Sequence, residues 1–185
     1  MTDVPQQREI ETVTTRKVYQ NKWMTLREDE IRRQSGAKGL YSVVEKPDFT
    51  IIIPIERNDI YMVEQYRYPI NERQLEFPQG AWEEKPDASP EALAAGELRE
   101  ETGFIADELI HVGYQYLAYG FCNQGYHIWV ARGLTMTQRN LDPEEEGLIT
   151  HKLSIQQLEQ RIKAGEIKDA TSCNAFGLAR LKGLI

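Results

Sequence analysis

The chain has 185 residues, of which 41% are hydrophobic, and its 22 basic and 29 acidic residues give a formal net charge of −7. This length suits one domain with a small added element. The acidic balance argues against a broad nucleic-acid-binding surface, which needs clustered basic residues, so we expect no nucleic-acid partner. No apolar run reaches the length of a membrane span, and residues 1–11 lack the apolar core of a signal peptide. We therefore expect no membrane association and a cytoplasmic location.

The N-terminal part of the chain predicts a small antiparallel sheet. Residues 1–12 are polar, so we expect them to be frayed. Residues 14–33 are typical of two strands joined by a turn at 20–22, and a glycine-containing turn at 35–39 leads to a third strand at 40–45. We therefore divide the chain into an N-terminal β appendage, residues 1–46, and a main domain, residues 47–185.

The main domain alternates strand and helix patterns. The apolar run Thr50–Ile55 is too short for most helices, so it predicts a central strand. Ser154 and Gln157 form a capping box that begins a later helix. Strands are expected at residues 50–55, 60–68, 108–117, 126–132 and 148–153, and helices at 90–102, 154–163 and 169–181.

Sulfur and imidazole side chains form no recognisable site in the sequence. The two cysteines, Cys122 and Cys173, have no metal-ligand spacing, and we expect buried thiols rather than a disulfide. The three histidines, His111, His127 and His151, are dispersed, so we expect strand or surface positions for them.

The helix at residues 90–102 has clear signals at both ends. Ser89 is a natural N-cap, Pro90 suits the first helical position, and Gly103 suits the position after the last turn. The apolar stripe expected to dock this helix onto a core consists of Ala94, Ala95 and Leu98.

Three glutamates share one face of this helix. Glu97, Glu100 and Glu101 stand at i, i+3 and i+4, where like charges cost roughly 0.2–0.5 kcal/mol per pair. They also crowd the negative end of the helix dipole, at roughly 0.3–1 kcal/mol each when exposed. A divalent cation such as Mg²⁺ or Mn²⁺ would reverse both penalties, because these ions prefer carboxylate, carbonyl and water ligands. The alternative is a solvated acidic face.

The stretch around this helix resembles the Nudix box. That motif is a glycine, five residues, a glutamate, seven residues, and then Arg-Glu-apolar-X-Glu-Glu-X-Gly-apolar. The last eight positions of the motif match Glu97-Leu98-Arg99-Glu100-Glu101-Thr102-Gly103-Phe104. Gly80 matches the first glycine of the motif, but the gap that follows it is two residues longer than in the motif. Gly96 stands in place of the arginine and Ala88 in place of the first glutamate. In the family these two residues support the helix as a pair, so we expect a rebuilt loop at residues 82–89.

The resemblance implies an α/β fold, a Nudix α/β/α sandwich with a mixed β-sheet, carrying the N-terminal antiparallel β appendage. It implies Glu97, Glu100, Glu101 and the backbone carbonyl of Gln79 as ligands of Mg²⁺, with Mn²⁺ possible in its place. Glu100 and Glu101 are accordingly also catalytic candidates.

Two further segments are similar to ADP-ribose pyrophosphatases. The run Glu64–Pro69 followed by Leu75–Gly80 resembles the segment before the box, which implies that Arg67 contacts the substrate pyrophosphate, with Glu76 beside it. The alternative for Arg67 is a surface salt bridge. In similar enzymes a glutamate from a later acidic loop acts as the base or orients the water, which implies Glu144, Glu145 or Glu146 here. We favour Glu145 or Glu146, and the alternative is a solvated loop.

The resemblance also implies a homodimer built through the N-terminal sheet. One departure concerns substrate range. The ADP-ribose subgroup carries a Ser-Pro-Gly-like loop where this chain has Ala118-Tyr119-Gly120, which favours a wider range of nucleoside diphosphate sugars. We therefore predict a metal-dependent pyrophosphohydrolase that cleaves ADP-ribose, GDP-mannose or a similar nucleotide sugar to a nucleoside monophosphate and a sugar phosphate. The alternatives are a Nudix hydrolase for dinucleoside polyphosphates or other nucleotides, and a non-catalytic ligand sensor.

Overall fold

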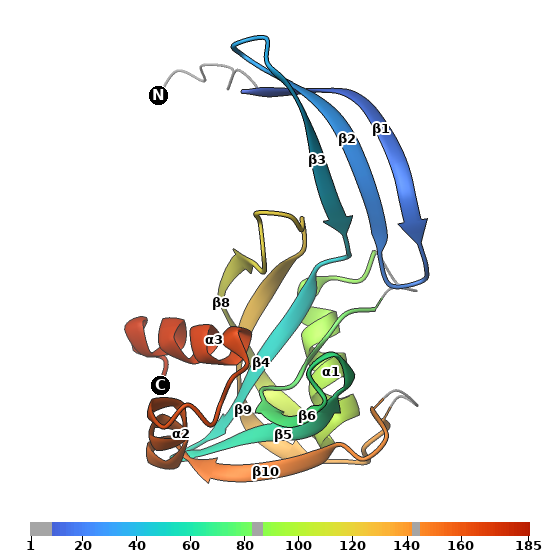
Figure 1. Ribbon diagram of the computed structural model, residues 1–185. Coiled ribbons are helices and arrows are strands. Elements are labelled where there is room, and N and C mark those ends of the chain that lie inside the picture. Colours follow the sequence, from blue (N-terminus) through green and yellow to red (C-terminus); the bar gives the residue numbers. More distant parts are fainter. Residues whose placement is uncertain (1–8, 83–86, 142–144) are drawn as a thin grey trace. The chain divides into compact units, whose positions relative to one another are not determined.

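A computed structural model describes residues 9–82, 87–141 and 145–185 (Figure 1). The chain divides into two compact units. One unit contains the chain up to Pro47 together with Tyr116–Gln124, and the other contains Asp48–Gln115 and Gly125–Ile185. No helix in the described part of the chain is long and apolar enough to cross a membrane.

The N-terminal unit is a three-stranded antiparallel sheet in the order β1-β2-β3. Its strands are β1 (Ile10–Gln20), β2 (Thr25–Arg33) and β3 (Lys38–Glu45). The three predicted strands are confirmed, but the turns are shorter than expected, because Gln20 still belongs to β1 and Lys38 and Gly39 already belong to β3. The expectation that residues 10–12 are frayed was wrong, because β1 begins at Ile10. Every residue of β1 is exposed and its register shifts twice, so the strand carries no apolar alternation that would mark its start.

The described residues of the second unit form a seven-stranded mixed sheet and three α-helices. The main order is β10-β5-β4-β9-β8, with β6 pairing β5 and β7 pairing β4. The elements are β4 (Phe49–Glu56), β5 (Asp59–Arg67), a 3₁₀ turn η1 (Tyr68–Ile70), β6 (Glu72–Glu76), β7 (Gln79–Gly80), α1 (Pro90–Thr102), β8 (Phe104–Tyr116), β9 (Gly125–Met136), β10 (Ile149–Ser154), α2 (Ile155–Lys163) and α3 (Ala170–Leu181).

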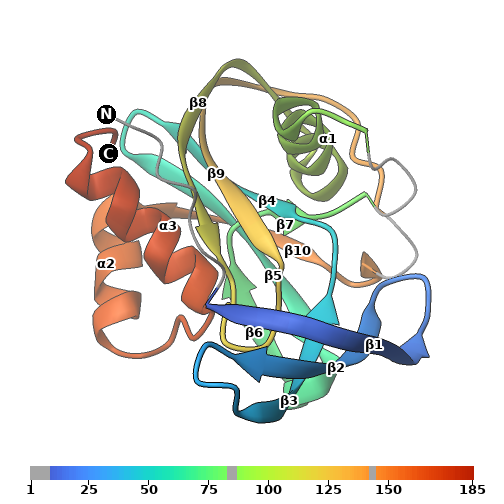
Figure 2. The same cartoon turned by 90° about the horizontal axis from the view of Figure 1, so that it is seen from above.

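Strand β4 is the centre of this sheet, as its apolar sequence predicts. All of its residues except Glu56 are buried, and it runs parallel to β9 and antiparallel to β5. Its side chains alternate between two cores, because successive residues of a strand point to opposite faces. Ile51 and Ile53 face the core that includes α2 and α3, whereas Ile52 faces the core beneath α1. The result is the predicted α/β/α sandwich, with α1 on one face of the sheet and α2 and α3 on the other (Figure 2).

The capping signals read from the sequence are present in the structure. The Ser89 hydroxyl accepts a hydrogen bond from the backbone N–H of Ala92 at 3.1 Å, and Gly103 takes the left-handed conformation with φ 79° at the end of α1. Ser154 and Gln157 form the expected capping box on α2. Of the apolar stripe predicted for α1, Ala94 and Leu98 are buried, but Ala95 is exposed. Leu93 is buried instead.

Both cysteines are free, as predicted, with Cys122 buried and Cys173 half-buried. The histidines are less dispersed than the sequence suggested. His111 on β8 and His127 on β9 meet across the two strands, with Nε2 and Nδ1 3.1 Å apart.

Candidate active site

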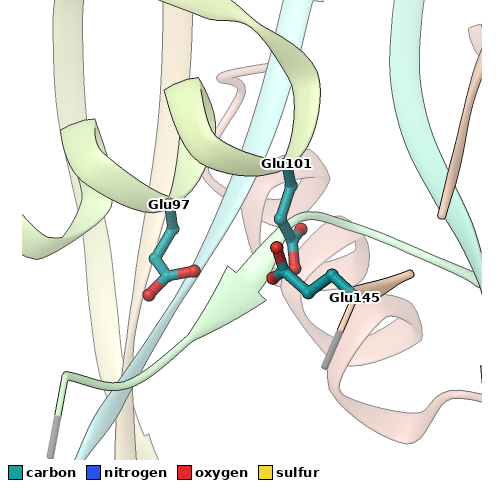
Figure 3. A group of neighbouring side chains, drawn as sticks. All are labelled: Glu97, Glu101 and Glu145. Atoms are coloured by element: carbon teal, nitrogen blue, oxygen red, sulfur yellow. The ribbon is translucent and has the colours of Figure 1, made fainter. Parts of the chain in front are cut away.

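Three carboxylates gather where α1 meets the segment before β10. Glu97 and Glu101 lie one turn apart on α1, and Glu145 comes from the opposite side (Figure 3). One oxygen from each residue lies within 4.8 Å of the others. Glu97 is 5% exposed and Glu101 only 1%, so two of the charges are held out of solvent.

Burial makes this cluster electrostatically unfavourable without a cation. The pKa of Glu101 is raised well above the ordinary carboxylate value, first by burial and then by the charges of Glu145 and Glu97. A divalent cation between the three carboxylates would remove the repulsion and keep them ionised. The donor set contains only oxygen, which is what Mg²⁺ and Mn²⁺ prefer. The described residues therefore fit such an ion.

Gly80 permits the close approach of Glu97 to strand β7. A Cβ atom at this position would lie 2.7 Å from Oε1 of Glu97 and nearer still to Oε2. Any larger residue would displace the carboxylate, which gives a steric reason for a glycine at the start of the motif.

Glu100 lies outside the group of three. It is half-buried, and its Oε2 accepts a hydrogen bond from the indole N–H of Trp82 at 3.3 Å. No sequence pattern singled out Trp82, although it stands only two residues after Gly80.

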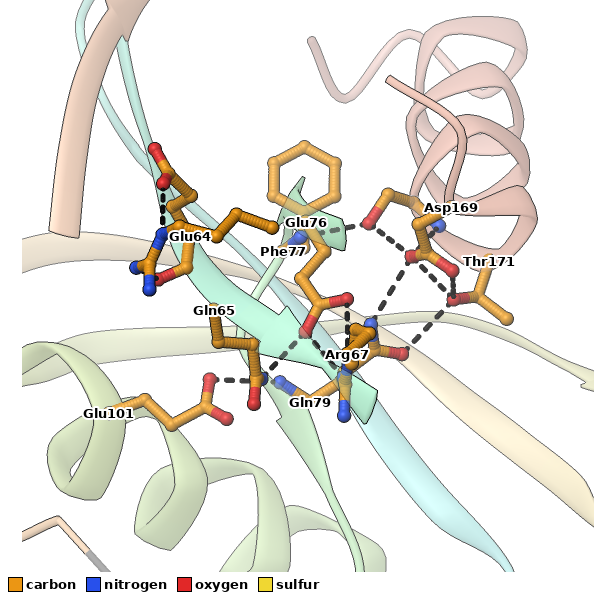
Figure 4. Close-up of polar contacts among 11 residues, drawn as sticks. Glu64, Gln65, Arg67, Glu76, Phe77, Gln79, Glu101, Asp169 and Thr171 are labelled. Atoms are coloured by element: carbon orange, nitrogen blue, oxygen red, sulfur yellow. Dashed lines mark hydrogen bonds and ion pairs between the residues drawn. The ribbon is translucent and has the colours of Figure 1, made fainter. Parts of the chain in front are cut away.

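Gln79 is fixed at both its backbone and its side chain (Figure 4). Its backbone N–H donates to Oε2 of Glu101 at 3.2 Å. Its side-chain amide donates to Asp169 at 3.2 Å and accepts from the hydroxyl of Thr171 at 3.0 Å. Asp169 is also the N-cap of α3, where it accepts from the backbone N–H and the hydroxyl of Ser172. The start of α3 therefore anchors the strand that carries the predicted carbonyl ligand.

Sequence reasoning identified Asp169 only as the beginning of the last helix. It lies 90 residues after Gln79, and no local pattern links the two. The polar run Asp169–Thr171–Ser172 is the one signal in the sequence that could have suggested a cap with additional partners.

Arg67 and Glu76 form an ion pair at the edge of the site. The guanidinium Nε donates to Oε2 of Glu76 at 3.2 Å, and a second nitrogen contacts Oε1. Glu76 is almost fully buried and also accepts from the Gln65 amide at 2.7 Å. Burial raises the pKa of Glu76, and the Arg67 charge opposes that rise. The arginine side chain remains 40% exposed, so one edge of it faces solvent.

The acidic loop is described from Glu145 onward. Glu145 is half-buried in the cluster, whereas Glu146 is exposed. Glu144 lies outside the described residues, as do residues 83–86 of the predicted rebuilt loop at 82–89.

The chain is similar to several known proteins. Residues 10–44 match a family model described as "Nucleoside diphosphate sugar hydrolase N-terminal domain". The chain is 29% identical to a methanol dehydrogenase activator from Bacillus methanolicus and 25% identical to an ADP-ribose pyrophosphatase from Bacillus subtilis, each over 94% of both chains. Its fold matches a crystal structure of an ADP compounds hydrolase with a TM-score of 0.84 and 21% identity, over 96% of each chain. In motif, fold and relatives the chain is thus similar to the ADP-ribose pyrophosphatases.

Proposed function

We propose that this chain is a divalent-metal-dependent pyrophosphohydrolase of nucleoside diphosphate sugars such as ADP-ribose and GDP-mannose. Its products are a nucleoside monophosphate and a sugar phosphate. The observation that carries the proposal is the meeting of Glu97, Glu101 and Glu145 within 4.8 Å at the Nudix helix. The names of the similar ADP-ribose pyrophosphatase and of the matching N-terminal family support the substrate class.

The proposed metal ligands are the carboxylates of Glu97, Glu100 and Glu101 and the backbone carbonyl of Gln79, with Mg²⁺ as the ion and Mn²⁺ as an alternative. When bound, such an ion polarises the diphosphate oxygens and lowers the pKa of a coordinated water. The hydrogen bond from Gln79 to Glu101 and the side-chain anchor on Asp169 hold strand β7 in place against α1. These contacts support a site in which Gln79 and Glu101 are held in place before substrate arrives, which limits reorganisation during the reaction.

Two other residues have proposed roles toward the substrate. Glu145 orients the attacking water or accepts its proton, because it reaches the cluster from outside the helix. The solvent-facing edge of Arg67 contacts the diphosphate, while its other edge stays on Glu76.

The gathered carboxylates favour an enzyme over a non-catalytic ligand sensor, since a sensor has no use for three acidic groups forced together. Dinucleoside polyphosphates are the other substrate class to test. The assay incubates the purified chain with ADP-ribose, GDP-mannose and a dinucleoside tetraphosphate, with Mg²⁺ or with EDTA. Phosphatase-coupled phosphate release and chromatography identify the products.

We expect nucleotide-sugar cleavage that EDTA abolishes, and loss of turnover in Glu97→Gln. Cleavage of the dinucleoside tetraphosphate alone would overturn the substrate class. Cleavage that persists in EDTA and in Glu97→Gln would overturn the metal-dependent mechanism.

We also propose that the N-terminal sheet forms a homodimer. Strand β1 is exposed along its whole length and presents apolar side chains to solvent, among them Ile10, Val13, Val18 and Tyr19. Large exposed apolar surface commonly marks a protein–protein interface. Val18→Glu should reduce the mass measured by analytical ultracentrifugation from dimer to monomer, whereas a wild-type monomer would contradict the proposal.

A further inference from the structure

The indole ring of Trp82 lies directly on helix α1 at Gly96. A Cβ atom at Gly96 would approach Cη2 of the ring to 2.5 Å and Cζ2 more closely. The ring can therefore occupy this place only because position 96 has no side chain. Glycine weakens a helix interior, so its presence here needs a packing reason, and the tryptophan supplies one.

The same ring also binds a glutamate one turn further along. Its N–H donates to Oε2 of Glu100 at 3.3 Å. Gly96 and Glu100 are four residues apart and lie on the same side of the helix. Trp82 thus spans one turn of α1: its six-membered ring packs on the backbone at Gly96, and its N–H bonds the carboxylate of Glu100.

Glu100 needs such a partner. It stands near the C-terminal end of α1 beside two other glutamates, where both the helix dipole and neighbouring charges favour turning its carboxylate toward water. A hydrogen bond from a ring that is itself held by packing restricts this long side chain to one region.

We propose that Trp82 is a positioning residue that holds the Glu100 carboxylate ready for a divalent cation, in place of the arginine and glutamate that are absent at Gly96 and Ala88. This inference rests on the metal site of the proposed function. Its test therefore uses metal binding as well as turnover.

The chain has three tryptophans, Trp23, Trp82 and Trp129, so protein labelled with 5-fluorotryptophan gives one ¹⁹F resonance for each. Trp82→Phe identifies the Trp82 resonance by its loss. During a Mg²⁺ titration we expect this resonance to shift, and we expect Glu100→Gln to abolish the shift. A Trp82 resonance that stays fixed while calorimetry shows the wild type saturating with Mg²⁺ would overturn the proposal.

Affinity gives the second readout. Trp82→Phe keeps an aromatic ring but removes the indole N–H. It should weaken Mg²⁺ binding and lower kcat about tenfold, the usual effect of removing a group that orients a metal ligand. Trp23→Phe, in the turn between β1 and β2, is the matched control and should behave like the wild type. Gly96→Ala leaves Trp82 intact but displaces it, so it should weaken Mg²⁺ binding in the same way.

Gly96→Ala also separates positioning from stability. The added Cβ displaces the ring, so a purely structural role predicts a variant that is less stable than wild type but has unchanged Mg²⁺ affinity. Wild-type affinity in this variant would overturn the proposal, and it decides the question even if Trp82→Phe fails to fold. If the wild type binds Mg²⁺ but cleaves no nucleotide sugar, the proposed function fails while the Trp82 shift still supports positioning.

Discussion

The backbone N–H of Gln79 donates a hydrogen bond to the carboxylate of Glu101 at 3.2 Å and so joins β7 to the last turn of α1. This contact fixes the most deeply buried acid of the cluster against the strand whose carbonyl is a proposed metal ligand. The properties of the site depend on this pairing, and the experiments below test its parts separately.

Glu101→Gln should abolish turnover without loosening the fold. The amide keeps the shape of the side chain but removes a charge from a site where three carboxylates repel one another. We expect turnover to fall by at least about 10²-fold, since metal-ion stabilisation is worth several kcal/mol. In EDTA the Tm of the variant should equal or exceed that of wild type, and Mg²⁺ should raise only the wild-type Tm. The exposed strand residue Glu108, changed to Gln, is the control.

The two described glutamates of the acidic loop should differ in importance. Glu145 lies in the cluster and Glu146 is exposed. Glu145→Gln should reduce kcat by about 10²-fold, the usual contribution of a positioned acid or base, with little change in KM. Glu146→Gln should have a much smaller effect. The reverse order in steady-state kinetics would assign the catalytic role to the outer residue.

Removing the cap of α3 should weaken both the fold and the site. Asp169→Ala deletes the acceptor of Gln79, Thr171 and Ser172 at once. We expect a loss of about 2 kcal/mol in the free energy of unfolding in urea, from the lost cap and the unpaired donors. Asp169→Asn keeps an acceptor oxygen and should lose less. Equal stability of Asp169→Ala and wild type would show that the anchor is dispensable.

Arg67 and Glu76 should show a strong double-mutant coupling. Arg67→Ala removes the ion pair of the buried Glu76 carboxylate and leaves its hydrogen bond with Gln65. We expect this to lower the free energy of unfolding by about 1–3 kcal/mol. Adding Glu76→Gln removes the buried charge and should recover most of that loss. If Arg67 also binds the diphosphate, KM rises in the single variant and stays high in the double variant. A KM that recovers together with stability would limit Arg67 to a structural role.

His127 should make stability depend on pH independently of the active site. Burial and the neighbouring His111 lower its pKa from 6.5, while Asp48 opposes the shift, and Tyr114 lies against its ring. Because the folded state favours the neutral imidazole, its contribution is complete above pH 6.5 and is lost as the pH falls through the lowered pKa. Unfolding free energies at about pH 7.5 and about pH 5.5 should therefore differ less in His127→Gln than in wild type. An equal difference in both proteins would show that other groups cause it.

Local signals predicted the three helices and most of the strands because their causes are local, whereas the short strands β6 and β7 were not predicted. The ends of α1 follow from Ser89, Pro90 and Gly103, and β4 follows from an apolar run buried on both sides. The start of β1 was missed because a fully exposed strand with irregular register has no periodic pattern.

The site residues that were predicted came from the pattern of one helix and from a family resemblance. The sequence did not distinguish Glu145 from Glu146, because a loop has no regular side-chain periodicity from which the buried residue can be predicted. The contacts of Trp82 with Gly96 and of Asp169 with Gln79 depend on tertiary packing, so single-sequence reasoning could not derive them.

The parallel pairing of β4 with β9 has a consequence for biogenesis. It brings Phe49 beside Tyr126, and α1 lies between these residues in the sequence. A nascent chain can therefore complete helix α1 while the central strand still lacks its neighbour β9. Pairing between strands that are far apart in the sequence is slow to form. Until it forms, the unpaired edge of the isoleucine-rich strand β4 is prone to pair with other chains. Newly made protein should thus be most vulnerable to aggregation in the interval before β9 leaves the ribosome.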